Sequence, residues 1–394
     1  MKIFFAFFLV ILAAFGGYHL SFRRVAGRSR LAWIHLTGLE FLALGLLLGP
    51  RFLNVLDEST ARSLEPLTAL ALGWIGLLLG FQFEIFQLRK FPPAFFLAML
   101  VESTLTVLVS FCFFYFFLPV FLPLPGSLQV LLPLVLAATA ACTSQSGLAL
   151  MFQGRAGSTA AAVRLVRYMA SLDGLVPMAV LVFIFFARTR EISVTPLHIL
   201  FLLAAALAGI FIIYMFFLAQ RRDADELALV IIGMTVVTSG TAAIAGFSPL
   251  LANFCMGVCL VNLTMEKEKI FHLLASIEKP VYLVLLIFLG ASWHLPDFWI
   301  AVPALAYFIV RFAAKIAGGM SAVHLLPALR RGFPGLLGLG LVEQGGLAVA
   351  ILFDFQQRFS GPEISYVVGF ALAAIVFAQL AGPYCAVLLF KRSE

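Results

Sequence analysis

Charged residues are scarce in this sequence. Asp, Glu, Lys and Arg make up 11% of its 394 residues, whereas hydrophobic residues make up 63%. No soluble core needs that much apolar surface, so the composition excludes a soluble globular protein and predicts a polytopic membrane protein. The alternating pattern of a transmembrane β-barrel is absent too. The apolar stretches of about 20 residues are therefore expected to be helices, and the predicted fold class is all-α.

Signatures of several function classes are also missing. No glycine-rich phosphate loop interrupts the apolar stretches, and no hydrolytic or redox constellation is present, so we expect neither an enzyme nor a cofactor. The 5 cysteines lie inside apolar stretches without a repeated metal-ligand spacing, and the 6 histidines are scattered. We interpret the cysteines as packing residues and expect no metal site beyond that of a transported ion.

The apolar stretches predict about thirteen transmembrane helices. Their centres lie near Phe8, Leu42, Trp74, Leu105, Ala138, Ala179, Ala206, Val236, Cys255, Leu285, Ile309, Val349 and Ala374. The loops between them are short, and nothing resembles a soluble domain or a long linker. Residues 1–394 are therefore expected to form a single membrane domain with no soluble C-terminal domain.

Lys and Arg are unevenly divided between alternate loops. Most of the 26 follow odd-numbered spans, including the cluster between Arg23 and Arg30. Positive charge stays on the cytoplasmic side, so we expect the N-terminus outside and the C-terminus in the cytoplasm of an inner (plasma) membrane. This topology explains the net charge of +7 without a nucleic-acid partner. The first span could instead be a signal peptide beginning at Lys2, although cleavage would leave the arginine cluster on the translocated side.

The second half of the chain carries a weak copy of the first, about 210 residues further on. Gly45–Pro50 matches Gly257–Asn262, and Leu77–Glu84 matches Ile287–His294. The offset is seven spans, an odd number, so the second copy would be inverted relative to the first. Inverted repeats are the construction of many secondary transporters. Repeat one is predicted over about 31–187 and repeat two over about 248–390.

Two spans at corresponding places in these repeats have polar, glycine-containing centres. They read ATAACTSQSG around Thr143 and LVEQGGLAV around Gln344. One interpretation is that small residues here permit close helix packing in lipid. Because both copies share the feature and buried ionisable residues accompany it, we favour two crossed discontinuous helices at a substrate site.

Six ionisable residues lie away from the ends of the predicted spans: Glu40, Glu102, Asp173, Arg311, Lys315 and Glu343. Asp173 lies inside YMASLDGLVPMAV, where a carboxylate costs about 2.5–3.5 kcal/mol and must face protein or a wet cavity. A proton and a small cation each neutralise such a group, so they can compete for it. We therefore predict that Asp173 binds a proton or a monovalent cation.

Other polar residues are assigned supporting roles. Oxygens of Thr143, Ser144 and Ser146 at the first break can replace water around a hard cation. Lys315, Arg311 and Glu343 are candidates for charge compensation at the ends of half-helices.

These assignments have alternatives. Asp173 could form a silent salt bridge with Arg311 or Lys315, and one of the two basic residues could snorkel to the interface. Glu343 could equally stabilise the second break or carry a proton. Glu40 and Glu102 are interpreted as interhelical hydrogen-bond partners rather than ligands.

Taken in order, the motifs resemble the monovalent cation:proton antiporter superfamily, and within it the second branch, over nearly the whole chain. The matching segments are LEFLALGLLLGP (39–50), LLLGFQFEIFQLRK (77–90), TSQS (143–146), Asp173, GFSPLLANFCMGVCLVN (246–262), IFLGASWHL (287–295), RFAAK (311–315) and EQGG (343–346).

The resemblance implies a sodium/hydrogen exchanger membrane domain with thirteen helices, a core domain holding the crossed helices and a separate dimerisation domain. It implies a homodimer that exchanges H⁺ for Na⁺ or K⁺ by an elevator-like movement. It also implies that Asp173 carries the ion and that Lys315 or Arg311 pairs with it.

One position departs from the family pattern. The residue before the key aspartate is usually Asp, Asn or Gln, whereas here it is Leu172. A lone acid favours one-for-one exchange, and the missing oxygen weakens the case for sodium. An alternative is therefore a transport-deficient sensor or scaffold that acts with a partner or regulatory subunit. A sodium-coupled organic-anion symporter is a third reading, but it would need more polar residues.

Overall fold

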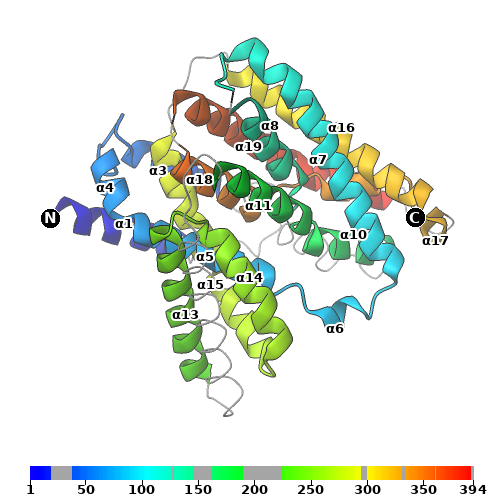
Figure 1. Cartoon of the computed structure of the whole chain (residues 1–394), viewed down its shortest axis with the longest axis horizontal. Helices are drawn as coiled ribbons and strands as arrows, with labels where there is room; N and C mark the ends of the chain where they lie inside the picture. Colours follow the sequence, from blue (N-terminus) through cyan, green and yellow to red (C-terminus); the bar gives the residue numbers. More distant parts are fainter. Residues whose placement is uncertain are drawn as a thin grey trace. The chain divides into compact units, whose positions relative to one another are not determined.

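The computed structural model of the chain (Figure 1) describes residues 1–18, 38–126, 128–144, 161–189, 224–293, 300–330, 333–359 and 361–391. These ranges are helical and contain no β-strand, so the predicted all-α class is confirmed. Six of the described helices are long and apolar enough to cross a membrane. They cover Pro93–Phe121, Ala161–Phe185, Glu226–Ile244, Lys267–Ser292, Ala301–Leu325 and Pro362–Gly382.

The predicted span centres agree with the described helices. All but one of them lie within a helix. The exception, near Ala206, lies outside the described residues, so the count of thirteen stays a prediction. The predicted arginine cluster between Arg23 and Arg30 also lies outside them.

The chain divides into two units that interleave along the sequence. Unit 1 comprises Met1–Leu88 and Phe185–Trp293, and unit 2 comprises Arg89–Ile184 and His294–Glu394. The helices of unit 1 are α1 (Lys2–Gly17), α3 (Leu39–Leu48), α4 (Glu58–Ser63), α5 (Glu65–Gly80), α6 (Ile85–Leu88), α13 (Ala224–Ile244), α14 (Pro249–Leu263) and α15 (Lys267–Ser292).

Glycines bring two helix pairs of unit 1 into backbone contact. A Cβ atom on Gly290 of α15 would lie 3.1 Å from the Cα of Gly45 in α3. A Cβ atom on Gly257 of α14 would lie 3.0 Å from the Cα of Gly80 in α5. Small residues allow such close approach of helices in lipid, where packing rather than water drives association. In the match between the two predicted repeats, Gly45 corresponds to Gly257 and Gly80 corresponds to Gly290. The predicted inverted repeat would therefore relate the contact of Gly45 with Gly290 to the contact of Gly257 with Gly80.

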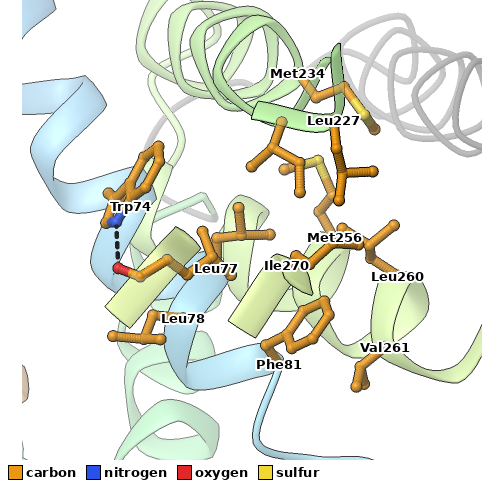
Figure 2. Close-up of a cluster of buried hydrophobic side chains, with 12 residues drawn as sticks. Trp74, Leu77, Leu78, Phe81, Leu227, Met234, Met256, Leu260, Val261 and Ile270 are labelled. Atoms are coloured by element: carbon orange, nitrogen blue, oxygen red, sulfur yellow. Dashed lines mark hydrogen bonds between the residues drawn. The ribbon is translucent and has the colours of Figure 1, made fainter. Parts of the chain in front are cut away.

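A hydrophobic cluster fills the space beside the glycine contact of α5 and α14 (Figure 2). Buried side chains from α5, α13, α14 and α15 form it, among them Leu77, Ile231, Leu260 and Ile270. Trp74 also belongs to the cluster, and its Nε1 donates a hydrogen bond of 3.1 Å to the carbonyl of Leu274. This bond satisfies the buried indole and ties α5 to α15.

Unit 2 contains the remaining described helices. They are α7 (Pro93–Phe121), α8 (Leu128–Ala141), α10 (Ala161–Leu172), α11 (Leu175–Thr189, which ends beyond the unit boundary), α16 (Ala301–Leu325), α17 (Pro327–Arg330), the 3₁₀ helix η3 (Leu337–Leu341), α18 (Gly346–Arg358) and α19 (Pro362–Lys391). Helix α7 packs against α8 and α16, and α16 also packs against η3 and α19. Figure 1 shows α7 and α16 running alongside each other.

The glycine contact of α5 and α14 yields a stability test. In Gly257→Ala the new methyl group would collide with the Leu77 carbonyl, so the helices must separate. Overpacking of this kind costs about 1–3 kcal/mol, and we expect a lower midpoint of thermal unfolding in detergent. The control is Gly233→Ala on α13, where nothing lies within 4 Å of the added Cβ. That variant should gain about 0.5–1 kcal/mol from helix propensity, and equal midpoints for the two variants would contradict the packing account.

A pH test concerns the end of unit 1 where α1 meets α4. Lys2 Nζ lies 2.6 Å from Asp57 Oδ2. This bond, with those from Thr60 and Ser59, holds the pKa of Asp57 below its ordinary value of 3.8. A lowered pKa in the folded state adds stability above the ordinary value, and that contribution is lost as the pH falls below about 4. Lys2→Met should therefore lower the unfolding midpoint at neutral pH in low salt, with the deficit shrinking towards pH 3. A deficit that does not change with pH would contradict this.

Candidate functional site

Two non-helical segments meet inside unit 2. Helix α8 ends at Ala141 and is followed by non-helical residues up to Ser144, whereas Val342–Gly345 separate η3 from α18. The segments touch where the Ser144 amide donates a hydrogen bond of 2.9 Å to the Glu343 carbonyl. A Cβ atom on Gly345 would lie 2.9 Å from the Cα of Ser144, so this close approach requires glycine. Both predicted breaks therefore lie at one point of contact.

Arg311 of α16 binds the helix ends that the breaks leave open. Its guanidinium donates to the carbonyls of Cys142 (2.9 Å) and Leu341 (3.3 Å), and also to that of Val342. The Cys142 carbonyl directly follows α8, and the Leu341 and Val342 carbonyls lie at the C-terminal end of η3. The last carbonyls of a helix carry partial negative charge and lack partners within the helix. Arg311 is 1% exposed, so it supplies both the positive charge and the donors that these buried carbonyls need.

Lys315, one turn further along α16, lies among four oxygen-bearing groups. Its Nζ lies 2.6 Å from the Ala141 carbonyl and 3.1 Å from Thr143 Oγ1. The same atom lies 3.2 Å from Glu102 Oε1 and 3.6 Å from Asp173 Oδ2. Both Lys315 and Glu102 are 0% exposed. The ammonium group therefore joins α16 to the end of α8, to α7 and to the turn that carries Asp173.

Asp173 lies in a turn that separates α10 from α11 within one apolar stretch. Its own amide donates to the Met169 carbonyl (2.8 Å), and its carbonyl accepts a long bond from Ser103 Oγ (3.4 Å). The residue is 2% exposed. Its Oδ2 accepts no hydrogen bond from the described part of the chain. A buried carboxylate oxygen without a donor is costly unless a proton or a cation occupies it.

A second polar network joins α8, α16 and the segment that precedes α18. Tyr307 and Thr139 share a hydrogen bond of 2.9 Å between their hydroxyl groups. Gln344 Nε2 donates to the Tyr307 hydroxyl (3.1 Å) and to the Thr139 carbonyl (2.8 Å). This network fixes the side chain of Gln344, whose Oε1 is buried without a donor among the described residues.

The structure brings most of the predicted site residues together. Thr143 contacts Lys315, and Ser144 meets Glu343 through the backbone. The side chain of Glu343 packs against α19. A Cβ atom added to Gly382 of α19 would lie 2.7 Å from the Cβ of Glu343. Ser146 lies outside the described residues.

Two features were not predicted as parts of the site. Glu102 was interpreted as an interhelical hydrogen-bond partner, and it does accept a hydrogen bond from Lys315, with which it also forms an ion pair inside the site. Its signal in the sequence is an acid inside an otherwise apolar span. The Tyr307 network had no such signal, because a tyrosine in an apolar span is common.

The described part of the site lacks the side chains that a resident metal ion would need. Among the described residues, no three His, Cys, Asp or Glu side chains lie close enough to hold a metal ion. Leu172, the last residue of α10, is 1% exposed and places no side-chain oxygen beside Asp173. A cation at Asp173 would therefore depend on this one carboxylate and on neutral oxygens near the first break.

Comparison with known proteins identifies a similar fold. No family model and no curated protein matches the sequence. A solved structure does match: the sodium proton antiporter MjNhaP1 from Methanocaldococcus jannaschii at pH 8, with a TM-score of 0.69 over 99% of each chain and 16% identity. This likeness shows that the chain has the fold of that antiporter.

The contacts of Arg311 yield a stability test. In Arg311→Lys a single nitrogen cannot reach carbonyls on both segments, whereas the planar guanidinium does so. Each buried carbonyl left without a donor costs about 1–3 kcal/mol, so the midpoint of thermal unfolding should fall by several degrees. The matched control is Arg62→Lys on α4, whose side chain is 78% exposed and which should unfold like the native protein. An Arg311→Lys variant as stable as this control would show that Arg311 does not hold the segments.

Proposed function

We propose that this protein is a secondary-active transporter that exchanges protons for a monovalent cation, Na⁺ or K⁺, across the membrane. The observation that carries the proposal is the carboxylate of Asp173, which is buried at a helix break with one oxygen free of hydrogen-bond donors among the described residues. Such an oxygen is neutralised either by a proton or by a cation, and competition between the two is exchange.

The surroundings of Asp173 support this assignment. Thr143 belongs to the first broken segment, and its Oγ1 contacts the same Lys315 ammonium group that lies near Asp173. Together with Ser144 and Ser146, it is our candidate for the neutral oxygens that replace water around the ion. The fold likeness to a sodium proton antiporter supports the same exchange chemistry.

The mechanism that we propose is elevator-like alternating access. Every side chain of the cluster belongs to unit 2, including Glu102, Asp173, Arg311 and Lys315. The unit can therefore carry the ion without taking the site apart. We further propose that the protein is a homodimer in an inner membrane. The distribution of Lys and Arg favours an orientation with the N-terminus outside and the C-terminus in the cytoplasm.

Leu172 favours a second candidate. A buried leucine beside the carrier acid supplies no cation ligand, which is compatible with a transport-deficient sensor or scaffold that acts with a partner subunit. The two candidates differ in one observable, because only the transporter moves protons when a cation gradient is applied.

Proton flux in proteoliposomes tests the proposal. With a pH-sensitive dye inside and Na⁺, K⁺ or Li⁺ added in turn, the native protein should move protons in response to at least one ion. Asp173→Asn keeps the size of the side chain and removes the charge, so it should reduce flux to the level of protein-free liposomes. The control is Asp57→Asn, the same chemical change at the N-cap of α4 in unit 1, which should keep native flux. If folded native protein gives no flux with any cation, the sensor or scaffold is the better account.

A further inference from the structure

The three N–H groups of the Lys315 ammonium have three partners at hydrogen-bond distance. These are the Ala141 carbonyl (2.6 Å), Thr143 Oγ1 (3.1 Å) and the Glu102 carboxylate, whose oxygens lie 3.2 and 3.4 Å away. An ammonium group has only three donors, so these contacts use all of them. Asp173 Oδ2, at 3.6 Å, lies beyond them and accepts no hydrogen bond from any described residue.

Packing holds Glu102 in this position. Thr106, one turn along α7, donates a hydrogen bond of 3.1 Å to Glu102 Oε1. On the facing helix, Gly318 leaves room for the glutamate. A Cβ atom at Gly318 would lie 2.9 Å from the Glu102 carbonyl oxygen and 3.2 Å from its Cγ. The close approach of α7 and α16 therefore sets the Glu102 carboxylate against the lysine that lies one turn earlier on α16.

The other charged groups of the cluster form no hydrogen bond with this pair, although Asp173 Oδ2 lies within ion-pair distance of Lys315 Nζ, at 3.6 Å. Arg311 directs its bonds at the carbonyls of Cys142, Leu341 and Val342. Two acids, Glu102 and Asp173, then face two bases, Lys315 and Arg311. Once Asp173 has taken up either a proton or a monovalent cation, the cluster carries the same charge, because each ligand adds one positive charge.

We propose that Glu102 and Lys315 form a self-contained ion pair that stays ionised throughout transport, so that Asp173 alone exchanges one proton for one cation. This inference rests on the proposed function and adds its stoichiometry. In the exchange step the Asp173 carboxyl group releases its proton to water, and the resulting carboxylate binds the cation. Lys315 keeps its proton in both loaded states. Glu102 is then a positioning residue, since it acts on the ion through Lys315.

The opposite arrangement makes a different prediction. If Lys315 depended on Asp173 for its counter-charge, a cation on Asp173 would leave the buried ammonium without an acid partner. Burial disfavours an unpaired charge, so the lysine would lose its proton, and two protons would move for each cation. The stoichiometry therefore distinguishes the two arrangements.

The transport test measures protons by dye and cations by isotope uptake in the same proteoliposomes. For the native protein we expect about one proton per cation. Glu102→Gln frees Lys315 to turn to Asp173 and compete with the cation, so the KM for the cation should rise at least about 10-fold. The double variant Glu102→Gln/Lys315→Gln removes both members of the pair and should restore most of this loss, again with about one proton per cation. A native ratio near two, or a double variant that binds the cation no better than Glu102→Gln, would overturn the proposal.

A thermal unfolding cycle tests the pair without any transport. Glu102→Gln and Lys315→Gln should each lower the unfolding midpoint by about 5 °C or more, and the double variant should recover most of it. Asp173→Asn should show little such coupling to Lys315→Gln. The matched control for the single change is Glu40→Gln on α3, outside unit 2. Stronger coupling of Lys315 to Asp173 than to Glu102 would overturn the proposal. Native protein without flux would count against the proposed function, while this cycle would still decide which carboxylate holds Lys315.

Discussion

The arrangement of unit 2 depends on one interaction, that of the Arg311 guanidinium with the carbonyls at two interrupted helix ends. Inside a membrane every backbone polar group needs a partner within the protein, so a helix break is costly unless something else binds its open carbonyls. Arg311 binds one carbonyl after α8 and two at the end of η3. Lys315 binds a further carbonyl, that of Ala141. These two basic residues on one face of α16 stabilise the contact between the segments. The contact in turn places polar groups inside unit 2.

The basic residues explain why acids are buried here. Two positive charges away from water need compensation, which Glu102 and Asp173 provide. The two carboxylates are nevertheless placed differently. Glu102 is bound by a lysine and a threonine, whereas Asp173 keeps one oxygen without a donor among the described residues. In the proposed mechanism, that asymmetry keeps Glu102 paired within the protein and leaves Asp173 available to an ion.

Local signals explain how much the sequence could predict. A polar run or an acid inside an apolar span is visible residue by residue, so both breaks and the position of Asp173 followed from the sequence. The pairing of Glu102 with Lys315 did not, because it depends on the register between α7 and α16, which lie about 200 residues apart in the chain. The turn at Asp173 was missed as well, although Gly174 and Pro177 beside it are residues that interrupt helices. In contrast, the glycines that the matched repeat segments share lie where helices of unit 1 contact each other.

The central claim is that a proton and a cation compete for the Asp173 carboxylate. Calorimetric titration of the detergent-solubilised protein with the transported cation tests it directly, over a pH series from about 5 to 8 and in two buffers of different protonation enthalpy. Competition predicts that cation binding weakens as the pH falls and that proton release rises towards one proton for each cation bound, with no binding by Asp173→Asn. Cation binding without proton release, or unchanged binding by Asp173→Asn, would contradict it.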